Sequence, residues 1–307
     1  MQGYLHSGPV DCTKPFDIDV LKGKTAIVTG GANGLGEAYV RALVTAGARV
    51  CVGDSDEERG RKLEQELDGA TFVRCDITKW DDQVRLFQKA ILFSRTGKIS
   101  HVIANAGIHR SDDIFSYSGD HQEPEEPNLS VVDVNIKGTL YTAKLAAHHF
   151  IRQNGTQSST EQEDTSLTLI GSGAAFLDCP RAPQYCASKW AMRGIMHSLR
   201  RTAFFHGGRV NVISPWYVKT NILSDETFKH VSSGGVEFAQ AEDAAQCLLR
   251  ILGDRSINGH SLFVSGRKWA SSGYIDLDLE DYPSNALIRE IQGDQIKSAP
   301  VELGLFL

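Results

Sequence analysis

The chain has 307 residues, enough for one large α/β domain or two small ones with a sizeable buried core. Its 32 basic and 38 acidic residues give a formal net charge of -6, which argues against nucleic acid as the main partner and favours small molecules. The six cysteines include no C-x-x-C pair and are predicted to be reduced core residues. Neither a basic-then-apolar leader nor an apolar run of membrane-spanning length is present, so we expect a soluble, cytoplasmic protein with no membrane partner.

Short apolar runs alternate with amphipathic helical patterns, after an N-terminal extension over 1–22 that we expect on the surface. The predicted strands cover 24–29, 48–53, 70–75, 99–104, 166–171, 209–214 and 260–264. The predicted helices cover 37–46, 57–67, 80–93, 129–152, 185–205 and 241–252. Because parallel strands need crossover connections, this alternation predicts a single Rossmann-type doubly wound α/β domain with a mainly seven-stranded parallel sheet flanked by helices.

Three segments lie outside this alternation. Residues 108–128 are polar and contain prolines, which indicates a loop. Residues 153–165 contain no apolar side chain and are predicted to be a solvated, flexible insertion. Beyond the domain at 23–266, the tail over 267–307 carries apolar side chains that we expect at a subunit interface or over a cleft. They are Tyr274, Leu277, Leu279 and Phe306.

A glycine loop, Thr29-Gly30-Gly-Ala-Asn-Gly34-Leu-Gly36, connects the first predicted strand to a helix. Glycine allows tight backbone dihedrals and the close approach of a phosphate, and the helix N-terminus favours negative charge. Since the loop follows the first strand of an α/β chain, it predicts a site for a dinucleotide diphosphate rather than an ordinary turn.

Asp54 ends the second predicted strand, 18 residues after Gly36, close to where an acidic group contacts the adenosine ribose of NAD. A carboxylate there would repel a 2′-phosphate, and no Arg or Lys at 31–33 or at Ser55 compensates for it. The sequence therefore predicts NAD rather than NADP. The alternative is a surface Asp in a strand-to-helix turn, because Arg59 and Arg61 lie nearby.

Tyr185 and Lys189 are four residues apart, so on a helix their side chains share one face. A phenol beside an ammonium is a candidate acid/base pair, since a nearby positive charge favours the phenolate. The spacing alone also fits an ordinary solvated helix face, so the interpretation depends on the other motifs of the chain.

Several motifs in a fixed order resemble the short-chain dehydrogenase/reductase family from Gly23 to Gly266, and most of all the 15-hydroxyprostaglandin dehydrogenase-type group with its fungal natural-product relatives. The matching segments are 29–36, 75–77, 105–107, Asn135, Ser172, Tyr185-x-x-x-Lys189 and Pro215-x-x-Val218-x-Thr220. The resemblance implies an oxidoreductase of secondary metabolism that forms a homodimer or homotetramer.

The resemblance also implies a catalytic tetrad. Tyr185 would be the general acid/base, and Lys189 would favour its phenolate and hold the nicotinamide ribose. Ser172 would hold the substrate oxygen, and Asn135 would position a water that relays protons from Lys189 to solvent. The implied cofactor-binding residues are Gly30, Asn33, Gly34, Leu35, Gly36, Asp54, Asp76, Ile77, Asn105, Ala106, Gly107, Tyr185, Lys189, Pro215, Trp216, Val218 and Thr220.

Two positions depart from the family pattern. Trp216 stands where the family usually has a glycine after its proline, so we expect the indole to crowd the nicotinamide or to reshape the substrate pocket. Ala104 replaces the first asparagine of the family's Asn-Asn-Ala-Gly, which removes one amide from the end of the fourth strand. The histidines lack the spacing of a metal site, and we expect none.

Residues 216–240 have the composition of a mobile apolar lid over the substrate, although an ordinary amphipathic helix packed on the core is the alternative. The apolar residues of this segment are Trp216, Tyr217, Ile222, Leu223, Phe228 and Phe238. In the loop before Tyr185, the polar residues Asp178, Arg181 and Gln184 contact either substrate or solvent.

The sequence thus predicts an NAD(H)-dependent oxidoreductase that interconverts a small, hydrophobic secondary alcohol and its ketone by hydride transfer, with Tyr185 as general acid/base. The alternative is a non-catalytic dinucleotide-binding sensor or assembly subunit that keeps the fold, an idea motivated by Trp216 and by the extra tail. The complete tetrad argues against this alternative, since a protein that only binds has no need of all four groups.

Overall fold

The computed structural model describes residues 4, 7–111, 113–220, 222, 225–279, 286–299, 301 and 304–305. Eight strands in these ranges form one sheet in the order β3-β2-β1-β4-β5-β6-β7-β8, with seven parallel strands and β8 antiparallel to β7. They are β1 (Thr25–Thr29), β2 (Arg49–Asp54), β3 (Ala70–Arg74), β4 (His101–Ala104), β5 (Thr165–Ile170), β6 (Gly208–Pro215), β7 (Ser261–Val264) and β8 (Tyr274–Asp276). The predicted doubly wound fold is confirmed, and the short β8 is an addition to it.

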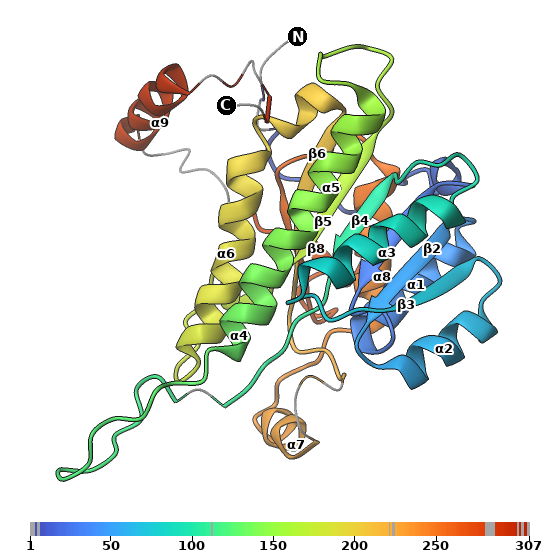
Figure 1. The fold of residues 1–307 in the computed structure, drawn as a ribbon. Coiled ribbons are helices and arrows are strands. Elements are labelled where there is room, and N and C mark those ends of the chain that lie inside the picture. The colour runs from blue at the N-terminus through green and yellow to red at the C-terminus, as the bar shows by residue number, and fades with distance from the viewer. Residues whose placement is uncertain are drawn as a thin grey trace.

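Helices cover both faces of the sheet (Figure 1). Apolar side chains of α1 (Gly34–Thr45) and α8 (Ala241–Gly253) form one core, with α2 (Glu57–Glu66) at its edge. The other core is formed by apolar side chains of α3 (Trp80–Phe93), α5 (Thr139–Asn154) and α6 (Pro183–Leu199). The remaining helices are α4 (Ser130–Val132), α7 (Asp225–Ser233) and α9 (Ala286–Ser298), with short turns at Asp19–Leu21, Asp133–Gly138, Gly173–Ala175 and Ala203–His206.

Two predicted helices are divided in the structure. The pattern over 129–152 contains a π-helical turn at Asp133–Gly138 between α4 and α5. The pattern over 185–205 ends as an α-helix at Leu199 and continues in the short Ala203–His206 turn. The sequence does not reveal these changes of winding, because apolar spacing marks the buried face of a helix and not which backbone hydrogen bonds it forms.

The N-terminal segment over 7–22 contributes to the core, although we expected it on the surface. Leu21 is fully buried, and Val10 and Phe16 pack against the α1/α8 core. The backbone N–H of Val10 donates a hydrogen bond to Asp276 Oδ2 at 2.9 Å, so this segment is tied to β8.

The insertion before β5 is held at its end by ion pairs, which corrects the prediction of a wholly solvated, flexible segment. Asp164 Oδ1 accepts a hydrogen bond from the buried Arg209 at 2.7 Å, and Glu163 accepts from Lys24 at 3.5 Å and from Lys98. A pattern of apolar residues does not reveal these contacts, because only polar groups make them.

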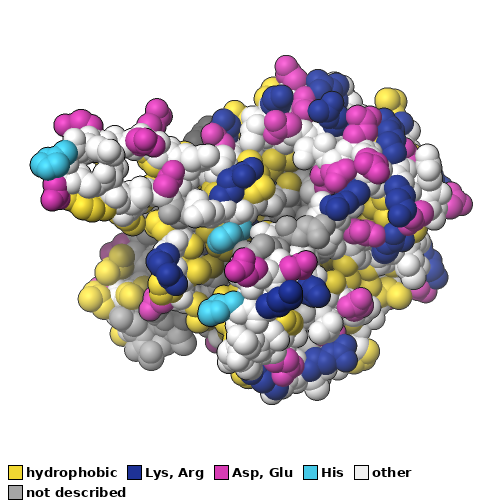
Figure 2. Space-filling model, turned by 90° about the horizontal axis from the view of Figure 1, so that it is seen from below, with side chains coloured by type: hydrophobic (Ala, Val, Ile, Leu, Met, Phe, Trp, Pro, Cys, Tyr) yellow, Lys and Arg dark blue, Asp and Glu magenta, His cyan; other side chains and the backbone are white. Residues whose placement is uncertain are grey.

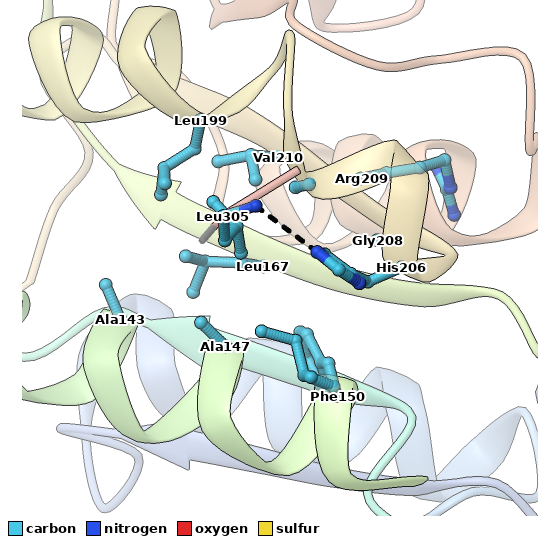
Figure 3. A pocket seen from close by; sticks show the side chains of 12 residues that line it. Ala143, Ala147, Phe150, Leu167, Leu199, His206, Gly208, Arg209, Val210 and Leu305 are labelled. Atoms are coloured by element: carbon cyan, nitrogen blue, oxygen red, sulfur yellow. Dashed lines mark hydrogen bonds between the residues drawn. The ribbon is translucent and has the colours of Figure 1, made fainter. Parts of the chain in front are cut away.

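The tail beyond the predicted domain has two different environments. Tyr274 is buried in the sheet, where its hydroxyl accepts a hydrogen bond from Arg250 at 2.9 Å, so it neither covers the cleft nor lies at a surface. Leu305 lies in a separate small apolar pocket beside α5, and its N–H donates to His206 Nε2 at 3.2 Å (Figure 3). Phe306 lies outside the described residues.

Candidate active site

One cavity of about 650 Å³ opens at the carboxyl ends of the parallel strands, the edge where doubly wound folds bind ligands. Its wall includes every predicted site residue except Asn135, which lies buried behind it. Figure 2 views the molecule from this side, where hydrophobic side chains lie near the centre together with acidic, basic and histidine side chains. In the part of the chain that the structure describes, no helix has both the length and the apolar character to cross a membrane.

The glycine loop forms one end of the cavity. Gly30 and Gly34 have φ angles of +62° and +55°, which glycine adopts without strain. A Cβ atom at Gly36 would lie 1.9 Å from the carbonyl oxygen of Gly30, so the turn closes only around glycine. Asn105, which follows the neighbouring strand β4, holds the loop in place. Its Nδ2 donates to the carbonyls of Thr29 and Gly30 at 3.0 and 2.8 Å.

Asp54 points into this end of the cavity rather than to solvent. Its Oδ2 accepts a hydrogen bond from the N–H of Ala32 at 2.9 Å, and only 7% of the residue is exposed. Arg59 and Arg61 do not neutralise it, because they pair with acidic residues of their own helix. The surface alternative considered for Asp54 is therefore wrong.

Asp76 adds a second carboxylate to the same end of the cavity. Burial raises the pKa of Asp76, but hydrogen bonds from Thr78 and the charge of Lys79 outweigh it, so the pKa lies below its usual value. Ile77 packs against Gly138 of the π-helical turn, where a Cβ would lie 2.6 Å from its Cδ1. Adjacent positions thus present one anionic and one apolar side chain to the cavity.

Tyr185, Lys189 and Ser172 meet at the other end. Tyr185 lies in the first turn of α6, which Pro183 begins, and Lys189 follows one turn later. Lys189 Nζ is 5.6 Å from the centre of the Tyr185 ring and donates to the carbonyl of Ile170 at 3.0 Å. The structure therefore brings the predicted pair together with Ser172, which hydrogen-bonds the Tyr185 hydroxyl.

Burial changes the titration of both groups. It raises the pKa of Tyr185, an effect opposed by the hydrogen bond from Ser172. It lowers the pKa of Lys189 to about 8, because an ammonium loses hydration in the protein interior. Lys189 is therefore still charged at pH 7. It loses its charge at a lower pH than an exposed lysine does.

Asn135 lies on the π-helical turn and joins three elements. Its Oδ1 accepts from the N–H of Ile108 at 2.8 Å, and its Nδ2 donates to the Ile108 carbonyl at 2.9 Å and to Ser188 Oγ at 3.0 Å. A Cβ placed on Gly107 would meet both Asn135 Oδ1 and Lys189 Nζ, at 3.2 and 3.5 Å. The two side chains therefore reach the same point behind the cavity wall.

Trp216 forms a wall beside Ser172. A Cβ on Gly173 would lie 3.2 Å from its indole, whose ring centres are 6.1 and 5.8 Å from those of Phe263 and Trp269. The indole thus packs between the Ser172 turn and β7, where it lines the cavity without filling it.

The substrate side also contains residues that the sequence analysis missed or left open. His109 lies edge-on to the Tyr185 ring at 5.0 Å, and its place two residues after Gly107 was a signal that could have identified it. In the predicted lid, α7 places Phe228 in the cavity wall and against Phe238, whereas Leu223 lies outside the described residues. Of the three polar loop residues, only Asp178 lines the cavity.

A family model described as short chain dehydrogenase matches residues 24–230, which contain the glycine loop and the tetrad. The chain belongs to the short-chain dehydrogenase/reductase family. It is therefore an oxidoreductase of a family that binds a nicotinamide dinucleotide and small-molecule substrates. The glycine-only turn, the carboxylate at Asp54 and a cavity of about 650 Å³ whose wall includes both Asp54 and Tyr185 fit such a cofactor.

Fungal enzymes are among the relatives. The chain is 31% identical to an NADP-dependent dehydrogenase of Phoma sp., over 87% of this chain and 81% of the relative. It is 30% identical to a 5′-hydroxyaverantin dehydrogenase of Dothistroma septosporum, over 86% of this chain and 90% of the relative. The solved structure of a Brucella melitensis 3-ketoacyl-(acyl-carrier-protein) reductase complexed with NADH shares the fold, with a TM-score of 0.67 at 24% identity over 80% of this chain and 98% of that chain.

Proposed function

We propose that this protein is an NAD(H)-dependent oxidoreductase that interconverts a hydrophobic secondary alcohol and its ketone, with Tyr185 as general acid/base. The observation that carries the proposal is the placement of two groups in one cavity. The buried carboxylate of Asp54 lies against the glycine loop at one end of the cavity. The Tyr185, Ser172 and Lys189 side chains lie at the other end.

The cofactor would be held along the cavity. The backbone amides of the glycine loop and the start of α1 would bind its diphosphate, and Asp54 would accept from the adenosine ribose hydroxyls. Asp76 and Ile77 would border the adenine, and Val218 and Thr220 the nicotinamide amide. When bound, the nicotinamide supplies or accepts a hydride.

This chain's residues would handle the proton. Tyr185 takes the hydroxyl proton during oxidation and returns it during reduction, while Ser172 donates a hydrogen bond to the same oxygen and stabilises the charge that develops there. The Lys189 ammonium favours the phenolate of Tyr185. Asn135, whose side chain lies near Lys189, would hold a water that passes the proton to solvent.

The preference for NAD rests on this chain and not on its relatives, because the Phoma relative is named NADP-dependent. The carboxylate of Asp54, which would face the adenosine ribose, would oppose the negative charge of a 2′-phosphate, and Asp76 adds a second carboxylate to the same end of the cavity. The apolar side chains of Leu177, Trp216 and Phe228 support a hydrophobic substrate.

A titration of the purified protein with NAD and NADP, followed by a redox screen of apolar secondary alcohols and ketones, tests the proposal. We expect tighter binding of NAD and turnover of at least one compound. NADP bound in preference to NAD would contradict the role of Asp54. Tight NAD binding without turnover across the panel would favour the non-catalytic alternative.

We expect a homodimer or homotetramer in light scattering.

A further inference from the structure

Two thiols lie together beside Tyr185. Cys186 follows Tyr185 in α6, and Cys179 lies in the loop before that helix, in the cavity wall. Cys186 Sγ donates to the carbonyl oxygen of Cys179 at 3.7 Å, so the side chain of one cysteine contacts the backbone of the other. Both residues are partly exposed, whereas the other four cysteines, Cys12, Cys51, Cys75 and Cys247, are buried.

We infer that Cys179 and Cys186 are a peroxide-sensitive thiol pair that closes into a reversible disulfide at the substrate side of the cavity. The contact between Cys186 Sγ and the Cys179 carbonyl places the two cysteines side by side. To form the bond, the loop and the first turn of α6 must bring the two sulfur atoms to the bond length and dihedral angle of a disulfide.

The chemistry requires hydrogen peroxide as the oxidant. The thiolate of Cys179 attacks one peroxide oxygen, the O–O bond breaks, and Cys179 becomes a sulfenic acid while hydroxide leaves. The Cys186 sulfur then attacks the Cys179 sulfur, the S–O bond breaks, and water leaves with the Cys186 proton. The hydroxide takes up the proton that Cys179 gave up earlier, so two thiols and one peroxide give one disulfide and two waters.

The two cysteines have different roles in this reaction. Burial, with Cys179 as neighbour, raises the pKa of Cys186 to about 11, so Cys186 is almost entirely a thiol at neutral pH and competes poorly for the peroxide, which leaves the first step to Cys179. Cys179 lines the cavity, where a small oxidant reaches it. Burial raises the pKa of Cys51 and of Cys75 to about 12, so these two are poor competitors.

The bond would act on the substrate side and not on the cofactor side. It would tie the loop that contributes Leu177, Asp178 and Cys179 to the cavity wall directly to the residue after Tyr185. The glycine loop and Asp54 lie at the opposite end. We therefore expect oxidation to lower kcat/KM for the substrate about tenfold or more, since small misplacements at a reacting centre are costly, and to leave NAD affinity within about twofold.

Mass spectrometry of the full chain, treated with hydrogen peroxide and then with dithiothreitol, tests the inference. We expect the intact mass to fall by two hydrogen atoms and to return after reduction, with a cross-linked peptide pair containing Cys179 and Cys186. After oxidation and unfolding, iodoacetamide should label four of the six cysteines. Cys179→Ser and Cys186→Ser should each prevent the loss of mass.

Oxidation of Cys179 only to sulfinic acid, a cross-link that includes a buried cysteine, or an unchanged mass in the wild-type chain would overturn the inference. The mass measurement needs neither a variant nor a substrate, so it is decisive even if a serine variant fails to fold. Only the activity arm rests on the proposed function. A disulfide in a protein without turnover would contradict the enzyme while leaving the thiol pair intact.

Discussion

The two ends of the cavity are built in different ways. At the cofactor end, the constraints lie in the backbone and in contiguous segments, such as the glycine loop and the strand end at Asp54. At the substrate end, side chains from four separated segments meet, represented by His109, Cys179, Trp216 and Phe228. The comparison indicates that a local motif builds the end proposed for the cofactor, whereas long-range packing shapes the end proposed for the substrate. Substitutions at the two ends should therefore have separable effects.

The largest effect is expected from Tyr185→Phe, which removes the proposed proton donor and acceptor but keeps the ring against His109. General acid/base catalysis contributes roughly 10²–10⁴-fold, so kcat should fall by that factor. The NAD dissociation constant, measured by fluorescence titration, should stay within about twofold. Full activity in this variant would exclude the proposed mechanism.

Gly36→Ala tests the cofactor end. The new Cβ would lie 1.9 Å from the carbonyl oxygen of Gly30, and overpacking of this kind costs about 1–3 kcal/mol. We expect the NAD dissociation constant from calorimetry to rise roughly tenfold to a hundredfold.

Gly194→Ala is the matched control for Gly36→Ala. Gly194 lies within α6, and a Cβ atom added there would have no neighbouring atom within 4 Å. Helix propensity predicts that this change stabilises the fold by up to about 1 kcal/mol without altering NAD affinity. If both variants bind NAD as the wild type does, the tight turn at Gly36 has no part in binding.

Asp54→Asn separates charge from shape at the cofactor end. Without the carboxylate, the repulsion of a 2′-phosphate decreases, and we expect the ratio of kcat/KM for NAD to that for NADP to fall about tenfold, or about 1.4 kcal/mol. Asp56→Asn is the control, because Asp56 caps α2 two residues away and does not line the cavity. An unchanged ratio in Asp54→Asn would place cofactor selection elsewhere.

Lys189→Met tests how the tetrad titrates. In oxidation, kcat/KM should rise with pH as Tyr185 loses its proton, and the Lys189 ammonium lowers the pH at which this happens while it remains charged, below its pKa of about 8. Removing that charge disfavours the phenolate, so the rising limb should move upward by about 1 pH unit or more. Lys137→Met, on the exposed side of the π-helical turn, should not move it.

The smallest effect is expected from Trp216→Gly, which restores the residue usual in the family. The indole packs on Gly173 and Phe263 beside Ser172, so its loss should raise KM for apolar substrates by about threefold to tenfold, with little change in NAD affinity. A stronger effect on NAD than on substrate would assign Trp216 to the cofactor end. Trp80→Ala, at a partly exposed residue outside the cavity, is the control.

Much of the site could be predicted because it depends on local spacing. One turn of helix fixes the relation of Tyr185 to Lys189, and a strand end followed by glycines fixes the place of the loop. The π-helical turn around Asn135, β8 and the ion pairs of Asp164 were not predicted, since each depends on contacts between distant segments. The position of His109 against Tyr185 was not predicted either, because it too depends on a contact between distant segments.

The sequence by itself predicted the doubly wound fold and the place of the glycine loop, because hydrophobic period and glycine positions act over a few residues. Its ordered motifs identified the family, and the proposed tetrad is what that resemblance implies. Only the tertiary structure decided that Asp54 points toward the glycine loop, that Trp216 forms a wall beside Ser172, and that Cys186 Sγ contacts the backbone of Cys179. These outcomes depend on how separate strands and loops are brought together by burial of two apolar cores, one on each face of the sheet.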